Sequence, residues 1–307
     1  MRYYASMQEL IGHTPLVELT HVDVPEGARF FAKLELWNPG GSAKDRIGRS
    51  MIADAERTGR LKPGGTIVEG TAGNTGLGIA FAALNKGYRV IFVVPEKFSV
   101  EKQTLMKALG AEIVSTPRSG GMLMAEAKAE ELAASIPGAI TMRQFKNRAN
   151  PRAHYETTGP EIFEDLDGKI DYLVCGAGSG GTFSGIMKYL KEKNPNVRIV
   201  AVEPASSPVL TQGRAGAHEI QGIGANFVPA VLNRDLLDEV IPVENEAAFA
   251  MARRIGKAEG VLVGISSGAA AWAAVELAKR SENAGKTIVA LLPDTGDRYL
   301  STKLFAE

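Results

Sequence analysis

The sequence lacks the features that mark secreted, membrane-bound or nucleic-acid-binding proteins. Its one cysteine, Cys175, excludes an internal disulfide and favours a reducing compartment. No apolar run approaches the roughly 20 residues of a membrane span, and the N-terminus lacks the apolar core of a signal peptide. Lysine plus arginine equals aspartate plus glutamate, at 35 each, without a basic cluster. We therefore expect a cytoplasmic protein with small-molecule ligands and without nucleic-acid or membrane partners.

Histidine is scarce as well, with four residues in the chain. His13, His21, His154 and His218 are scattered and do not have the spacing of metal ligands. No metal site is predicted.

The remaining pattern is that of an α/β protein. Strand-like apolar runs alternate with helical periodicity, which predicts largely parallel sheets flanked by helices, and 307 residues favour two subdomains. A polar N-terminal helix and one helix over 152–163 are expected, whereas 204–238 has no clear periodicity. The clearest predicted strands are 89–94, 171–175, 197–202 and 287–292. The clearest predicted helices are 44–59, 122–135 and 181–193.

Residues 38–46 (NPGGSAKDR) place Lys44 at the start of a predicted helix. A proline and two glycines break regular structure just before it, and apolar residues then recur at helical spacing. The partial positive charge of a helix N-terminus disfavours a second cation, and a neutral amine is the form that makes a Schiff base. Taken alone, the stretch favours a simpler interpretation, a solvated lysine paired with Asp45.

Residues 69–78 (EGTAGNTGLG) form a glycine-rich loop between a predicted strand and a helix. Backbone N–H groups in such a loop converge on an anion, and the helix dipole helps. Thr71, Asn74 and Thr75 add side-chain donors, and the size suits a carboxylate. The alternative is a tight turn whose glycines serve packing only.

Residues 176–182 (GAGSGGT) form a second such loop. Its first, third and sixth residues satisfy the dinucleotide fingerprint, and Glu203 ends the next strand, where a ribose-binding acid belongs. An NAD-dependent oxidoreductase is therefore an alternative. Against it, the hydroxyls of Ser179 and Thr182 suit a terminal phosphate, and an oxidoreductase leaves Lys44 and the first loop unexplained.

A third feature, residues 263–269 (VGISSGA), joins an apolar run to a helix, and Ser266 or Ser267 would cap that helix. Together, a reactive lysine, a phosphate-sized loop and a carboxylate-sized loop are what pyridoxal 5′-phosphate (PLP) acting on an amino acid requires.

These motifs show that the sequence resembles the fold-type II PLP-dependent enzymes, and within them the cysteine synthase and cystathionine β-synthase family. The resemblance covers nearly the whole chain. It is carried, in order, by 11–16 (IGHTPL), 38–46, 71–76, 144–150 (QFKNRAN), 176–182, 221–224 (QGIG), 264–268 (GISSG) and 293–300 (PDTGDRYL).

The resemblance implies roles for the residues that contact the cofactor. Lys44 matches the lysine that holds PLP covalently and later moves protons as general base and acid. Asn74 matches the asparagine that hydrogen-bonds the cofactor's 3′-oxygen. Ser266 matches the serine that faces the pyridine nitrogen, which in the family accompanies β-elimination and replacement. The phosphate loop is matched by Gly178, Ser179, Gly180, Gly181 and Thr182.

The resemblance also implies a substrate site. Ala72 departs from most cysteine synthases, which have serine there, so one donor beside the substrate carboxylate is lost and substrate specificity carries over less firmly. Gly222 belongs to a segment, 222–224, that lines the entrance opposite the cofactor. The substrate-binding residues implied are Thr71, Ala72, Gly73, Asn74, Thr75, Gln144 and Gly222.

The fold implied is that of fold-type II PLP enzymes, similar to the tryptophan synthase β-chain. It predicts a larger PLP-binding subdomain at 1–40 and 147–307 and a smaller, mobile one at 41–146 that carries Lys44 and the carboxylate loop. The family is typically homodimeric. The sequence has neither a haem-binding extension nor a C-terminal regulatory domain, so the long animal-type enzyme is not expected.

The activity implied is β-replacement, making L-cysteine from O-acetyl-L-serine and sulfide. Within the family, condensation of an activated serine with homocysteine to give cystathionine is an alternative, and so is cysteine desulfhydration. The leaving group, whether acetyl, phosphate, hydroxyl or thiol, stays open. A non-catalytic binding or regulatory subunit is a further alternative, which the intact cofactor-contacting positions disfavour.

Overall fold

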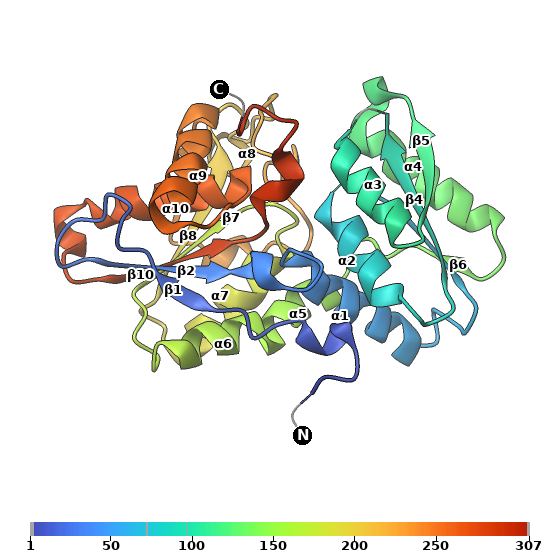
Figure 1. The fold of residues 1–307 in the computed structure, drawn as a ribbon, viewed down its shortest axis with the longest axis horizontal. Helices are drawn as coiled ribbons and strands as arrows, with labels where there is room; N and C mark the ends of the chain where they lie inside the picture. Colours follow the sequence, from blue (N-terminus) through green and yellow to red (C-terminus); the bar gives the residue numbers. More distant parts are fainter. Residues whose placement is uncertain (1–2, 72, 97, 306–307) are drawn as a thin grey trace. The chain divides into compact units, whose positions relative to one another are not determined.

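The computed structural model describes residues 3–71, 73–96 and 98–305. Contacts divide the chain into two compact units (Figure 1), of which the first comprises residues 1–11 and 44–150 and the second residues 12–43 and 151–307. The subdomain boundaries expected from the sequence, and the mobility of the smaller subdomain, stay predictions.

The first unit is built on a four-stranded parallel sheet with the order β5-β4-β3-β6. Helix α4 packs on β3 and β4 through Val68, Ile91, Val93, Ala125 and Ala129. The elements are η1 (Met7–Leu10), α1 (Lys44–Arg57), β3 (Thr66–Gly70), α2 (Asn74–Ala83), β4 (Arg89–Pro95), α3 (Val100–Ala108), β5 (Glu112–Thr116), η3 (Arg118–Gly120), α4 (Gly121–Ser135) and β6 (Ala139–Ile140).

The second unit is built on a six-stranded sheet with the order β1-β2-β10-β7-β8-β9, in which only the β1–β2 pair is antiparallel. Its elements are β1 (Leu16–Glu18), β2 (Arg29–Leu34), η2 (Glu35–Trp37), α6 (Thr158–Asp165), β7 (Tyr172–Gly176), α7 (Gly181–Lys193), β8 (Arg198–Pro204), α8 (Val209–Gln212), η4 (Arg234–Leu236), β9 (Glu239–Val243), α9 (Asn245–Glu259), α10 (Ile265–Ala278), η5 (Ser281–Asn283), β10 (Thr287–Leu292) and η6 (Gly296–Tyr299). Helix α5 (Ala149–Glu156) begins in the first unit and ends in the second.

Alternation along the central strands buries both faces of this sheet. In β10, Ile288 and Ala290 pack into one apolar cluster, with α9 and α10, whereas Val289 and Leu291 pack into another, with α6 and α7. Cys175 lies in the second cluster as a buried strand residue, as its apolar neighbours predict. The predicted fold class, α/β with two largely parallel sheets, is confirmed.

Two predicted helices differ in the structure. The helix expected over 152–163 is two helices, α5 and α6, because Thr157 leaves helical geometry at φ −128° and ψ −71°. The polar N-terminal helix is only the single turn η1. Residues 204–238 form no regular element longer than four residues within the described chain, as their lack of periodicity predicts.

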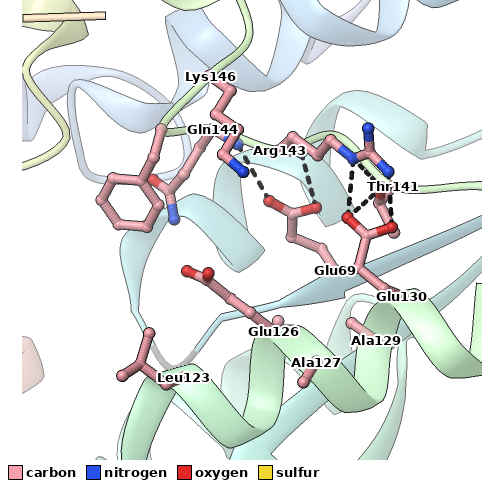
Figure 2. Close-up of a pocket in the computed structure, with 12 residues that line it drawn as sticks. Glu69, Leu123, Glu126, Ala127, Ala129, Glu130, Thr141, Arg143, Gln144 and Lys146 are labelled. Atoms are coloured by element: carbon pink, nitrogen blue, oxygen red, sulfur yellow. Dashed lines mark hydrogen bonds and ion pairs between the residues drawn. The ribbon is translucent and has the colours of Figure 1, made fainter. Parts of the chain in front are cut away.

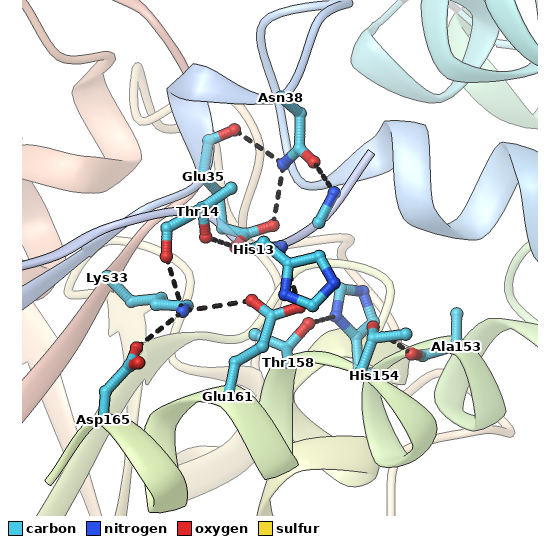
Figure 3. Close-up of polar contacts among 12 residues, drawn as sticks. His13, Thr14, Lys33, Glu35, Asn38, Ala153, His154, Thr158, Glu161 and Asp165 are labelled. Carbon is cyan, nitrogen blue, oxygen red and sulfur yellow. Dashed lines mark hydrogen bonds and ion pairs between the residues drawn. The ribbon is translucent and has the colours of Figure 1, made fainter. Parts of the chain in front are cut away.

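A buried lysine connects β2 to α6 (Figure 3). Lys33 is fully buried, and its Nζ donates to the Thr14 carbonyl at 2.7 Å and lies 3.0 Å from Glu161 and 3.2 Å from Asp165. The Thr14 hydroxyl donates to Glu35, whose carboxylate also accepts from Asn38 (Figure 3). This network fixes the 11–16 motif and the start of the lysine motif.

In the described part of the chain, none of the helices has both the length and the apolar character that crossing a membrane requires. Across the same residues, no group of three or more histidine, cysteine, aspartate or glutamate side chains could hold a metal ion.

Candidate active site

Lys44 is the first residue of α1 and is half-buried. Its position depends on the packing of α1 against α2, which touch backbone to backbone. A Cβ on Gly48 would lie 2.2 Å from the Gly78 carbonyl oxygen, and a Cβ on Gly78 would lie 2.2 Å from that of Lys44. Only glycine fits at either position, so this contact holds the Lys44 backbone one turn along α2 from Asn74.

The asparagine loop leads from β3 into α2, and Asn74 is the first residue of that helix. The Gly73 N–H faces the Thr71 hydroxyl at 3.4 Å, and Thr71 and Thr75 are both buried. The N-terminus of α2, at Asn74, carries partial positive charge and favours an anion. Ala72 lies outside the described residues.

Gln144 lies beside this loop. Its Oε1 accepts from the Thr75 hydroxyl at 2.6 Å, and its backbone carbonyl accepts from the Asn150 side chain at 2.8 Å. The structure therefore brings together Thr75 and Gln144, two residues that the sequence assigns to one carboxylate site. Their role in binding a substrate carboxylate stays a prediction.

Glu69 is a residue of this region that the sequence did not single out (Figure 2). Its buried carboxylate accepts backbone N–H groups from Met142 at 2.8 Å, Arg143 at 3.1 Å and Gln144 at 3.4 Å. Burial raises the pKa of the Glu69 carboxyl to about 7, although these three N–H groups act to lower it. The available signal was a charged residue at the end of an otherwise apolar strand.

An open cavity of about 480 Å³ adjoins Glu69 in the first unit (Figure 2). Burial raises the pKa of the Glu126 carboxyl, against the lowering effect of Lys146. Arg143 is bound at the cavity's edge by a two-point ion pair to Glu130, with both N···O distances 2.7 Å. The cavity is also lined by Gly70, Leu123, Ala127, Ala129, Thr141, Gln144 and Phe145.

In the second unit, the loop 176–182 runs from the end of β7 to the start of α7. A Cβ on Gly178 would lie 2.3 Å from the Gly222 carbonyl oxygen, and the Gly224 N–H donates to the Ala177 carbonyl at 3.1 Å. Gly180 has φ +80°, which favours glycine. The segment 222–224 therefore packs directly on the loop. The loop leads into the N-terminus of α7, a helix of 13 residues.

Ser266 joins the same region. It lies in the first turn of α10 and is buried, and a Cβ on Gly222 would lie 3.2 Å from its hydroxyl oxygen. The second unit thus brings together the loop, Gly222 and Ser266. The loop and Ser266 fit PLP, because a phosphate suits the N-terminus of α7 and the neutral Ser266 hydroxyl suits the ring nitrogen.

His154 supports the phosphate loop, although its sequence position gave no sign of this. The ring is fully buried, and its Nδ1 lies 2.8 Å from the Thr158 hydroxyl (Figure 3). Its Nε2 lies 3.0 Å from the Thr182 hydroxyl. Each ring nitrogen therefore has a hydroxyl partner, and the Thr182 side chain is held in one orientation.

Glu203, the acid that a dinucleotide site would use, has a structural role. Its buried carboxylate accepts the backbone N–H groups of Leu210 at 2.7 Å and Thr211 at 3.2 Å and the Thr211 hydroxyl at 2.5 Å. The alternative of an NAD-dependent oxidoreductase therefore loses the residue that would bind a ribose.

Comparison with known proteins agrees with this donor set. The family model described as "Pyridoxal-phosphate dependent enzyme" matches residues 7–294. The chain is 50% identical over 305 residues to an O-acetylserine dependent cystathionine β-synthase of Bacillus subtilis strain 168, covering 99% of each protein. It is also 50% identical over 302 residues to a cysteine synthase of Staphylococcus aureus strain Mu50, covering 98% of this chain and 97% of the relative.

A solved structure shares the fold. The crystal structure of a cysteine synthase from Entamoeba histolytica superimposes with a TM-score of 0.95 at 43% identity, covering 99% of this chain and 91% of that one.

Proposed function

Because this chain belongs to the pyridoxal-phosphate dependent enzymes, we propose that it is a cysteine synthase, which makes L-cysteine and acetate from O-acetyl-L-serine and sulfide. The family membership also confirms the predicted cofactor, PLP. The observation that carries the proposal is the donor set of the second unit, in which a phosphate-sized loop, Gly222 and the neutral Ser266 lie together.

PLP, when bound, supplies an electron sink for the charge left when the substrate Cα loses its proton. The loop residues Gly178 to Thr182 hold its phosphate, with Thr182 oriented by His154. Ser266 would face the ring nitrogen without protonating it, and Asn74 would donate to the cofactor's ring oxygen. A neutral partner such as Ser266 would favour loss of a group from Cβ over transamination.

Lys44 holds and moves the proton. Its neutral amine removes the proton from Cα, the Cβ–O bond breaks and acetate leaves with the electron pair. Sulfide then forms a bond to Cβ, and the Lys44 ammonium returns its proton to Cα. Substrate and product differ only at Cβ, so one amine can serve both proton transfers.

The substrate carboxylate is held by Thr71, Gly73, Thr75 and Gln144, together with first-turn N–H groups of α2. Because the Thr75 hydroxyl already donates to the Gln144 Oε1, the Gln144 amide is oriented before the anion binds and needs little reorganisation. With the carboxylate bound, water is excluded from the reacting centre.

Homocysteine is the second candidate acceptor, because the Bacillus subtilis relative is an O-acetylserine dependent cystathionine β-synthase at the same 50% identity as the cysteine synthase. Both candidates share the donor, so we expect acetate to be the leaving group in either case.

Two measurements test the proposal. The purified protein should be yellow, and borohydride should link the cofactor to the peptide that contains Lys44. O-Acetylserine, O-phosphoserine, serine and cysteine, each combined with sulfide or homocysteine, should give the most product with O-acetylserine and sulfide, as identified by mass. Faster formation of cystathionine would change only the proposed acceptor, from sulfide to homocysteine. The absence of product from every pair would overturn the proposed activity.

We further propose that the enzyme acts as a cytoplasmic homodimer. Light scattering after size-exclusion chromatography should give twice the chain mass of 32.6 kDa. A monomer mass at micromolar concentration would contradict the proposal.

A further inference from the structure

We propose that Glu69 is a positioning residue for the amino-acid substrate, because its carboxylate organises the turn 142–144 and so places the Gln144 amide. The inference rests on the proposed function, in which Gln144 binds the substrate carboxylate. Glu69 itself contacts neither cofactor nor substrate in this account and acts through Gln144.

The first step is the turn itself. Successive N–H groups of Met142 and Arg143 point at one carboxylate oxygen of Glu69, at 2.8 Å and 3.1 Å. Such a concavity of consecutive N–H groups binds anions. Arg143 has φ +53°, a left-handed conformation that a residue with a Cβ adopts at a cost. The anionic side chain of Glu69 offsets that cost.

The second step leads from the turn to Gln144. The second carboxylate oxygen of Glu69 faces the Gln144 N–H at 3.4 Å, so the backbone of Gln144 is tied to β3. The side chain of Gln144 then accepts from Thr75 at 2.6 Å. Among the described residues, no hydrogen bond uses its amide nitrogen, which leaves that donor for a substrate oxygen.

The third step concerns charge. An ionised carboxylate only accepts hydrogen bonds and can serve all three N–H groups, whereas protonation places a donor against them. Glu126 on α4 faces Glu69 and disfavours its ionised form. Arg143 is engaged by Glu130 on α4, and Lys146 interacts with Glu126. Since the pKa of Glu69 is raised to about 7, its ability to order the turn should fall between pH 8 and pH 6.

The main experiment is Glu69→Gln in the PLP-bound protein, with Glu126→Gln as the matched control. Both variants replace a carboxyl on the same cavity by an isosteric amide, and of the two, Glu69 is the one that accepts the hydrogen bonds of the turn within the described residues. At pH 8, E69Q should raise the KM for O-acetyl-L-serine about tenfold with kcat and the KM for sulfide little changed, because a hydrogen bond to a charged group is weakened. E126Q should leave the KM unchanged.

Hydrogen exchange supplies a readout that needs no turnover. The amides of 142–144 should exchange faster in E69Q than in the wild type or E126Q. Equal exchange and equal KM in E69Q and E126Q would overturn the inference. Wild-type protein without turnover would overturn the proposed function instead, and faster exchange in E69Q would then still show that Glu69 orders the turn.

Gln144→Ala provides the test if E69Q does not fold. When Glu69 acts through Gln144, the ratio of the KM of Q144A to that of the wild type should shrink as the pH falls from 8 to 6, because the wild type loses the ordered turn. A ratio that stays constant would overturn the inference. In the double variant, adding E69Q to Q144A should change the KM less than E69Q does alone.

Discussion

Lys44 is the residue on which the proposed chemistry most directly depends. Lys44→Ala should still bind PLP weakly through the phosphate loop, but turnover should fall by roughly three orders of magnitude or more, because both the covalent attachment and the proton carrier are lost. Absorbance of the bound cofactor and steady-state rates would measure this. The exposed Lys62, replaced by alanine, is the control, and near-normal turnover in Lys44→Ala would contradict the proposed mechanism.

Glu69 gives a pH dependence of stability with a defined sign. Its folded-state pKa, about 7, lies above the ordinary value of 4.5, so its contribution to stability is present below pH 4.5 and is lost as the pH rises through 7. The unfolding free energy of the wild type should therefore fall, relative to E69Q, by roughly 3 kcal/mol between pH 4.5 and pH 8. Urea titrations of both proteins at several pH values would measure it. Parallel pH profiles of the two proteins would show that burial does not raise the pKa of Glu69.

At the scale of elements, the glycine contact between α1 and α2 leaves no room for a side chain. Gly48→Val should destabilise the protein by about 3 kcal/mol or more, because the new side chain meets the Gly78 carbonyl and forces the helices apart. Gly73→Ala is the comparison for stability, because a Cβ there meets no described atom within 4 Å. Thermal unfolding would compare the stabilities of the two variants. Equal losses of stability would mean that α1 and α2 can move apart without an energetic cost.

The elements differ in how well the sequence predicted them. Helix α7 and strand β10 begin and end where periodicity places them, at 181–193 and 287–292. The break at Thr157 was missed because apolar spacing continues across it, although Pro160 in the first turn of α6 was the available signal. Apolar periodicity indicates which face of a helix is buried, but it does not indicate that the helix axis changes direction at a single residue.

At the scale of the whole molecule, motifs that are continuous in the sequence could be predicted, whereas contacts between distant residues could not. The loops at 71–76 and 176–182 could be recognised because each is continuous in sequence. The contact of Glu69 with 142–144 joins residues more than 70 positions apart, and that of Gly48 with Gly78 appears only once the helices pack. Neither has a sequence pattern, since each depends on tertiary structure.

Removing PLP should lower the stability of the whole protein, because a ligand that binds only the folded state stabilises it by mass action. At a PLP concentration 100 times Kd, the loss on removal is about 2.7 kcal/mol. Unfolding temperatures of the holo protein, of the protein stripped with hydroxylamine and of the reconstituted protein would measure it. Lys44→Ala should show a smaller shift at the same PLP concentration, and no shift in either protein would indicate that PLP binds the unfolded chain equally well.

The burial of Cys175 has a practical consequence for observing this enzyme in solution. Its sulfur lies in the apolar cluster between the second unit's sheet and its helices, so the only native thiol is shielded from dyes. One cysteine introduced at the exposed Lys62 and another at the exposed Lys188 would place a label on each unit. Fluorescence energy transfer between them would follow the distance as O-acetyl-L-serine is added, and a constant signal would argue against the predicted mobility of the smaller subdomain.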